Sequence, residues 1–316
     1  MASRNTQASA NGVTRRWTLA SGLDVSGDEW GEPDVQPVVL LNGGGQTRHA
    51  WKGLGTKLAA AGYRAVALDA RGHGDSDWSA DGVYTEDLFM ADLADVVAQL
   101  GDHRPVLVGA SLGGGTALLA VGEGHVDPRA LVLVDIAPTV ERAGADRIPD
   151  FMRPRPEGFG SIEEAAPAVA EYIPHRPRPA RTDGLVKNLR LGDDGRYRWH
   201  WDPGYINRVF DLEARERRMS AAARNLDVPT LLVRGGKSDV LSEEGAREFR
   251  ELCVPTRSTP TWRLQHTWWP VTTTTRSPVL SRAFSIAARR RLAQNGADRV
   301  TVRSDPRPVD SLSRRR

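Results

Sequence analysis

Short runs of almost purely apolar residues recur along the chain, and most are followed by a segment whose apolar residues have helical spacing. A strand that is apolar at nearly every position is buried on both faces, which requires helices on both sides of a mostly parallel sheet. The sequence therefore predicts an α/β fold. The predicted strands are residues 37–41, 64–68, 105–108, 130–134 and 229–233, and the predicted helices are residues 51–61, 85–100, 112–121 and 242–252.

This alternation of strands and helices stops between residues 137 and 224, where prolines and aromatic residues are frequent. A long insertion of this kind in a compact fold is commonly a functional lid, so we expect an inserted helical cap. The predicted organisation is a disordered extension (1–14), a first core part (15–137), the cap (138–224), a second core part (225–253) and an atypical basic tail (254–316).

Composition narrows the class of protein. Of the 316 residues, 40% are hydrophobic and 26% are charged, with no stretch near 18 consecutive apolar residues, so we expect a soluble protein. A lone cysteine, Cys253, excludes an internal disulfide and a cysteine-rich zinc site. No secretory signal is recognisable, which predicts a cytoplasmic location. The tail has 13 arginines against 3 acidic residues, but it lacks a nucleic-acid-binding motif and follows an acidic body, so neither nucleic acid nor membrane is an expected partner.

The motif Gly109-Ala110-Ser111-Leu112-Gly113 lies between the predicted strand at 105–108 and the predicted helix at 112–121. This context is typical of a G-x-S-x-G nucleophile elbow, in which the glycines permit a sharp turn that lifts the serine hydroxyl into a cleft. The N-terminus of the helix favours developing negative charge. Ser111 is therefore the candidate nucleophile, and the alternative is a glycine-rich turn with an incidental serine.

A second glycine-rich segment, Asn42-Gly43-Gly44-Gly45, ends the predicted strand at 37–41. Acyl transfer needs N–H donors at the position where the oxyanion forms, and the backbone N–H groups of Gly44 and Leu112 are the natural pair. A tight turn or a phosphate-binding loop would also use glycines. The phosphate-loop pattern G-x-x-x-x-G-K-[ST] is absent from the sequence, which makes the phosphate-binding interpretation weak.

Two further segments, Asp69 to Ser76 and Gly235 to Asp239, are informative together with the two glycine-rich segments described above. In these four segments the sequence resembles the α/β-hydrolase superfamily, in the branch of serine esterases, non-haem haloperoxidases and epoxide-hydrolase-like proteins. The resemblance covers residues 17–253 in the expected order and departs at Asn42, where the family usually has histidine. Epoxide hydrolases carry aspartate at the elbow, so Ser111 implies acyl hydrolysis, with perhydrolysis as a side activity. No metal or other cofactor is implied.

The resemblance also implies a triad in the chain order serine, acid, histidine. It assigns the acid to Asp239, after the strand at 229–233, and it leaves Asp135, at the end of the preceding strand, as the rival. The acid would orient the imidazole and stabilise the imidazolium. The provisional base is His266, the single histidine after Asp239; His73 precedes the nucleophile, and His200 in the cap is expected to be a surface or pocket residue.

The tail after Cys253 does not resemble the family, which carries its histidine in a stretch like Thr-His-Met-Val-Ala-Gly-Asp. In a reading frame that joins the third base of each codon to the first two bases of the next codon, the codons possible around Trp268 and Trp269 permit that stretch. We therefore hypothesise that the chain is frame-shifted from about Thr256. The alternative is a genuine, solvated basic tail.

The predicted function is a hydrolase with a serine nucleophile that acts on a small hydrophobic ester or a related acyl substrate. Trp199, Trp201 and Tyr205 are expected either to line an apolar substrate pocket or to pack the cap on the core. A catalytically impaired pseudoenzyme or small-molecule binding module on the same fold, and a carbon–carbon bond hydrolase, are the alternatives. The expected partner is a small-molecule substrate, and the sequence predicts no oligomeric state.

Overall fold

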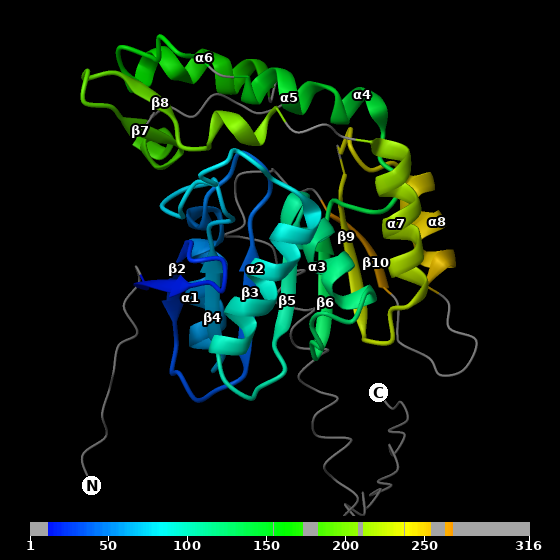
Figure 1. Ribbon diagram of the computed structural model, residues 1–316. Helices are drawn as coiled ribbons and strands as arrows, with labels where there is room; N and C mark the ends of the chain where they lie inside the picture. The colour runs from blue at the N-terminus through cyan, green and yellow to red at the C-terminus, as the bar shows by residue number, and fades with distance from the viewer. Residues whose placement is uncertain are drawn as a thin grey trace, which may run out of the picture. The chain divides into compact units, whose positions relative to one another are not determined.

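A computed structural model describes residues 12–153, 155–172, 183–207, 211–236, 238–253 and 263–267 (Figure 1). The core strands are β1 (Val13–Thr18), β2 (Asp24–Trp30), β3 (Pro37–Leu41), β4 (Arg64–Leu68), β5 (Val106–Ala110), β6 (Ala130–Val134), β9 (Thr230–Gly235) and β10 (Arg263–Thr267). The core helices are η1 (Arg48–Trp51), α1 (Lys52–Ala60), α2 (Glu86–Gln99), α3 (Leu112–Gly122), α7 (Leu212–Arg224) and α8 (Glu243–Leu252).

The eight core strands form one sheet in the order β1-β2-β4-β3-β5-β6-β9-β10. The first two strands pair antiparallel, β2 pairs antiparallel with β4, and every other pair is parallel. The mostly parallel sheet is therefore confirmed. Because parallel strands end at the same edge, the turns after β3, β5, β6 and β9 lie together, which is where ligands bind in open α/β sheets.

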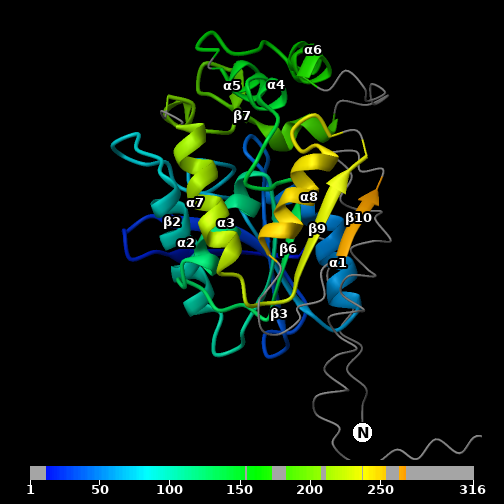
Figure 2. The ribbon, with the colours of Figure 1, turned by 90° about the vertical axis from the view of Figure 1, so that its right-hand side faces the viewer.

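Helices cover both faces of the sheet, as the wholly apolar strands require. Figure 2 shows α2, α3 and α7 on one face and α1 on the opposite face. The main core lies under α2, α3 and α7 and includes Leu107, Leu118 and Leu133, which are completely buried. The side chain of Thr85 caps the start of α2, where it accepts a hydrogen bond from the N–H of Leu88 at 3.3 Å.

The cap elements follow β6. They are α4 (Arg142–Ala145), α5 (Arg147–Met152), α6 (Ile162–Tyr172), η2 (Asp183–Asn188), β7 (Leu189–Leu191), β8 (Tyr197–Trp199) and η3 (Pro203–Tyr205). In contrast to the predicted boundary at 224, α7 belongs to the core layer. Its Met219 lies in the main core, and a side chain on Gly122 of α3 would overlap the backbone of Ala222.

The ends of the chain lie mostly outside the described residues. This applies to residues 1–11 of the expected N-terminal extension and to residues 254–262 and 268–316 of the tail, including the segment of the frame-shift hypothesis. The exception in the tail is β10, which pairs in parallel with β9 and adds an edge strand to the sheet. None of the helices in the described ranges has the length and apolar character needed to cross a membrane.

Candidate active site

Ser111 lies in the turn between β5 and α3. Its φ of 44° is in the left-handed region, which costs energy for a residue with a side chain and persists only when neighbours enforce it. The backbone N–H of Ser111 donates to the carbonyl of Val134 at 3.1 Å, and its carbonyl accepts from Gly115 at 2.8 Å. The Ser111 hydroxyl makes no capping bond to α3, so the helix does not use it.

The two glycines of the elbow motif have neighbouring atoms where a side chain would lie. A side chain on Gly109 would clash with the carbonyl of Gly113, and a Cβ on Gly113 would lie 2.5 Å from the Cβ of Leu41 in β3. Real Cβ atoms do not approach that closely, so only glycine lets α3 start directly over the end of β3. The glycines therefore set both the turn and its distance from the next loop.

That next loop is the turn Gly43–Gln46, which we call the oxyanion turn after the role that the sequence predicts for Gly44. The N–H of Gln46 donates to the carbonyl of Gly43 at 3.1 Å, and Gly45 has a φ of 70°, as the third residue of a type II turn requires. A Cβ on Gly43 would lie 3.6 Å from the Cβ of Ser111, so the turn and the elbow are neighbours. The N–H of Leu112 is the first of α3 and has no acceptor within the helix.

Asn42 holds the oxyanion turn from the core side. This residue is 1% exposed, and its amide nitrogen donates to the carbonyls of Gly43 at 3.0 Å and Gln46 at 2.8 Å. Its amide oxygen accepts from the N–H of Ala70 at 3.0 Å, and its backbone carbonyl accepts from Gly113 at 3.1 Å. The asparagine at the position where the family usually has histidine therefore ties the turn to the elbow and to the loop after β4.

The loop after β4, residues 69–76, forms a third wall of the site. Asp69 is fully buried, pairs with the Arg48 guanidinium and accepts from the N–H groups of Arg48 at 2.6 Å and Asp75 at 3.0 Å. Burial raises the pKa of Asp69, and the adjacent Arg48 opposes that rise. A side chain on Gly74 would overlap the Asp69 carboxylate, so the loop closes tightly over this ion pair.

The two acid candidates have different surroundings, and Asp135 lies beside the elbow. Ala110 of β5 is paired with Val134 of β6, so Ser111 and Asp135 follow at the ends of adjacent strands. Asp135 has a φ of 57°, and it shares a positive φ with Ser111 alone among the described residues other than glycine. Its carboxylate accepts from the N–H of Gly235 at 3.1 Å and from the hydroxyl of Ser238 at 2.9 Å. Burial raises the pKa of Asp135, and these two donors oppose the rise.

Asp239, the acid expected from the resemblance, lies farther along the turn after β9. Its side chain is 51% exposed and pairs with Arg147 of the cap helix α5. A side chain on Gly144 of α4 would overlap the Asp239 backbone, so this part of the turn packs against the cap. The contacts of Asp239 therefore lead to the cap, whereas those of Asp135 stay within the end of the sheet.

His266 lies in β10, one residue before the end of the strand, and is paired with Arg234 of β9. The strand order places β10 three strands from β5. With strands about 4.8 Å apart, the backbone of His266 is roughly 14 Å from that of Ser111. The described residues therefore bring Ser111, the oxyanion turn and Asp135 together, but they do not bring His266 to them.

The aromatic cluster of the cap packs against the oxyanion turn. Trp199, Trp201 and Tyr205 are 6%, 3% and 4% exposed, and the two indole rings stack with centroids 4.9 Å apart. A Cβ on Gly44 would lie 3.0 Å from the Tyr205 hydroxyl, and a Cβ on Gly45 would lie 3.5 Å from Trp201. Of the two expected roles, packing the cap on the core is therefore the one these contacts show, with the Tyr205 hydroxyl as the group nearest to Gly44.

Sequence reasoning missed His200, which lies between two of these aromatic residues. It was expected at the surface or in a pocket, but it is 2% exposed and contacts both the oxyanion turn and Gly74. The alternation of Trp199, His200 and Trp201 after a short strand was the available signal, because a histidine flanked by buried tryptophans is itself a candidate for burial.

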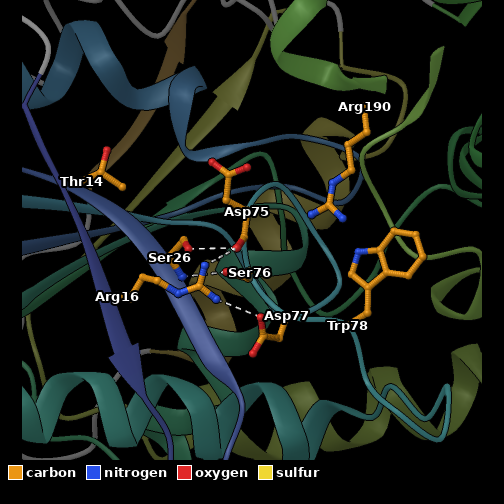
Figure 3. Close-up of a pocket in the computed structure, with 8 residues that line it drawn as sticks. All are labelled: Thr14, Arg16, Ser26, Asp75, Ser76, Asp77, Trp78 and Arg190. Atoms are coloured by element: carbon orange, nitrogen blue, oxygen red, sulfur yellow. Dashed lines mark hydrogen bonds and ion pairs between the residues drawn. The ribbon is translucent and has the colours of Figure 1, made fainter. Parts of the chain in front are cut away.

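A cavity of about 530 Å³ lies away from these residues, beside the β1–β2 hairpin. Its lining in Figure 3 shows Arg16 donating to Asp77 at 2.9 Å and Arg190 of β7 near Trp78, with the guanidinium 5.2 Å from the ring centroid. Asp75 of this lining pairs with Arg48 outside it, and none of the candidate catalytic residues lines this cavity. In the described part of the chain, no three His, Cys, Asp or Glu side chains gather as metal ligands.

Comparisons with known proteins agree with this geometry. The family model for the alpha/beta hydrolase fold matches residues 36–260. Esterase Rv0045c of Mycobacterium tuberculosis is 30% identical over 249 residues, which cover 77% of this chain and 80% of that protein. Its crystal structure superposes with a TM-score of 0.64 at 26% identity, covering 89% of this chain and 91% of that one.

A second relative, the bifunctional esterase/perhydrolase DCH of Acinetobacter calcoaceticus, is 27% identical over 237 residues, which cover 72% of this chain and 83% of that protein. The family match spans well over half of the sequence and includes the elbow, the oxyanion turn and the loop after β9. Together with the parallel sheet, this match shows that the chain belongs to the α/β-hydrolase family and is a hydrolase by its relatives.

Proposed function

We propose that the protein is a serine hydrolase that cleaves small hydrophobic esters or related acyl compounds. The observation that carries this proposal is the strained Ser111 at the start of α3, beside the oxyanion turn. Such strain in a residue with a side chain is typical of functional sites. The relatives named as esterases support the same chemistry, and the one named as a perhydrolase supports perhydrolysis as a side activity.

In the proposed reaction, the Ser111 hydroxyl oxygen attacks the acyl carbonyl carbon while its proton passes to a base. The oxyanion accepts hydrogen bonds from the N–H groups of Gly44 and Leu112, and the start of α3 adds its positive dipole end. The carbon–oxygen bond of the ester breaks, the alcohol leaves with the proton, and water then releases the acid from Ser111. The apolar contacts of Met152 and Trp201 at Gly45 favour a small apolar acyl group.

For the acid, the surroundings support Asp135 over Asp239. Asp135 adjoins Ser111 in the sheet register and is held by two donors, which would keep its carboxylate oriented toward an imidazolium. Asp239 is the competing candidate, because the resemblance assigns the acid to it. Its carboxylate pairs with Arg147 of the cap, so a histidine would share it with that arginine.

The proposal is tested with a fluorophosphonate probe and with p-nitrophenyl acetate. We expect the probe to label the wild-type protein once per chain and the ester to give a burst of p-nitrophenol, since both report acylation-type attack by an activated serine. The Ser111→Ala variant should lose both signals, and Ser79→Ala, a loop serine that bonds Asp81, should keep them. Equal labelling of the wild type and Ser111→Ala would refute the proposed nucleophile.

A second candidate function is a binding module that keeps the fold without turnover, and the position of His266 favours it. Removing the base of a triad leaves only the weak catalysis of the oxyanion hole and of binding. His266→Ala separates the two candidates. A fall of about 10³-fold or more in kcat would assign the base to His266. An unchanged rate in an active protein would place the base elsewhere, and a wild-type protein without a burst would support the binding module.

A further inference from the structure

His200 joins the cap to two loops of the core. It directly follows β8, is 2% exposed, and its Nδ1 accepts a hydrogen bond from the N–H of Gly74 at 2.8 Å. Its Nε2 lies 3.4 Å from the carbonyl oxygen of Gly45. A neutral imidazole has one donor and one acceptor nitrogen. Because Nδ1 is the acceptor, Nε2 carries the proton and donates it to Gly45.

The carbonyl of Gly45 belongs to the peptide that closes the oxyanion turn. The other side of that peptide, the N–H of Gln46, donates to the carbonyl of Gly43. The Gly45–Gln46 peptide is therefore held on both sides, by the turn itself and by His200. The Gly43 carbonyl that accepts this bond belongs to the same peptide group as the Gly44 N–H, so the orientation of the Gly44 N–H depends on the Gly45–Gln46 peptide. Asn42 holds the same turn from the core, so His200 is its counterpart in the cap.

The contact between His200 and Gly45 lies among apolar groups of the cap. A Cβ on Gly45 would lie 3.4 Å from the side chain of Met152 and 3.5 Å from that of Trp201. The Trp201 ring also meets the His200 imidazole edge-on, with centroids 5.2 Å apart, which fixes the imidazole plane. A hydrogen bond away from water is stronger than the same bond in water. Burial also lowers the pKa of His200 well below its ordinary value of 6.5, so the ring is neutral.

We propose that His200 is a positioning residue through which the docked cap aims the Gly44 N–H at the oxyanion. This proposal rests on the proposed serine hydrolase function and adds that the oxyanion hole is complete only when the cap is seated. His200 touches neither the substrate nor Ser111 in this scheme. Its loss should therefore lower the rate of the chemical step and leave substrate binding unchanged.

Two substitutions separate the two hydrogen bonds of His200. In His200→Asn, the amide oxygen can take the place of Nδ1 and keep the bond to Gly74, but the side chain is too short to reach Gly45. In His200→Gln, the amide nitrogen can take the place of Nε2 and keep the donor to Gly45. We expect His200→Asn to lower kcat for p-nitrophenyl acetate about 10- to 100-fold at unchanged KM, somewhat less than the loss of an oxyanion donor. His200→Gln should recover most of that loss.

The rate of fluorophosphonate labelling should follow kcat, because phosphonylation of serine uses the same oxyanion hole. Urea unfolding of both variants gives the structural comparison. Equal losses of kcat in the two variants, or a loss confined to KM, would overturn the proposal. If neither variant folds, a long-range ¹H–¹⁵N spectrum of the wild-type protein decides the tautomer, and a proton on Nδ1 of His200 would also overturn it. A wild-type protein that the probe does not label would instead refute the proposed function itself.

Discussion

The nucleophile side and the acid–base side of the proposed site differ in the contacts that position their residues. On the nucleophile side, the elbow and the oxyanion turn are joined by the side chain and backbone of Asn42, and a Cβ on Gly113 would meet β3. On the acid–base side, the acid has two candidates with different contacts, and His266 lies in an edge strand. The nucleophile side and the acid candidate Asp135 are thus built on strands adjacent in the sheet, whereas the candidate base His266 lies in the edge strand, far from the elbow.

This difference shows which part of an α/β-hydrolase site is locally encoded. The elbow and the oxyanion turn each occupy a few consecutive residues with glycines at fixed places. The base must come from a distant segment that reaches back over the sheet. A change in the tail of the chain can therefore remove the base and leave the nucleophile side intact.

The largest expected effect that sharpens this comparison concerns the acid. We expect Asp135→Asn to lower kcat about 10⁴-fold, as the loss of a carboxylate that orients a catalytic histidine does in other triads. The matched variant Asp239→Asn removes the partner of Arg147 at a half-exposed site and should change kcat less than about threefold, because exposed ion pairs contribute little. Steady-state hydrolysis of p-nitrophenyl acetate measures both.

If Asp239→Asn lowered kcat more than Asp135→Asn, the acid would be Asp239. Equal and small effects of both substitutions on an active enzyme would mean that the histidine is oriented by neither carboxylate. Because Asp135 also holds the turn after β9 through Gly235 and Ser238, unfolding in urea should accompany the kinetics. A loss of kcat at preserved stability is the result that identifies the acid.

The sequence predicted the five central strands and four of the core helices closely, and it placed Ser111 in the turn between a strand and a helix, but it did not predict the core helix α7. Gly109, Ser111 and Gly113 form one contiguous motif, and nearly all-apolar runs such as residues 130–134 have few alternatives to a buried strand. It did not predict that Asp135 would have the better-held carboxylate, because that depends on Ser238 from another strand's turn. The partners of His200 were likewise not predictable, since Gly45 and Gly74 are over 120 residues away in the sequence.

A smaller effect is expected from adding one methyl group between the elbow and β3. In Gly113→Ala the new Cβ would lie 2.5 Å from the Cβ of Leu41 and 2.8 Å from the carbonyl oxygen of Asn42, so backbone has to move. We expect the free energy of unfolding to fall by about 1–3 kcal/mol, as for other overpacked core sites. Gly184→Ala is the control, because its Cβ would meet nothing within 4 Å. If both variants unfold at the same urea concentration, the close approach of α3 to β3 is incorrect.

The smallest expected effect is a pH dependence that distinguishes the cap contact from the rest of the site. The pKa of His200 is lowered by burial first and then by His73, and Arg190 and His49 also disfavour the imidazolium. The unfolded chain therefore binds a proton at His200 at a higher pH than the folded chain does. Stability from this group is complete above about pH 6.5 and is lost as the pH falls below it.

Between pH 6 and pH 5, the wild type should lose up to about 1.4 kcal/mol more unfolding free energy than His200→Gln. Parallel urea titrations at the two pH values measure the difference. If the free energy of unfolding of the two proteins depended on pH in the same way, His200 would not be held neutral between Gly45 and Gly74. The contact of the cap with the oxyanion turn would then not depend on the protonation of His200.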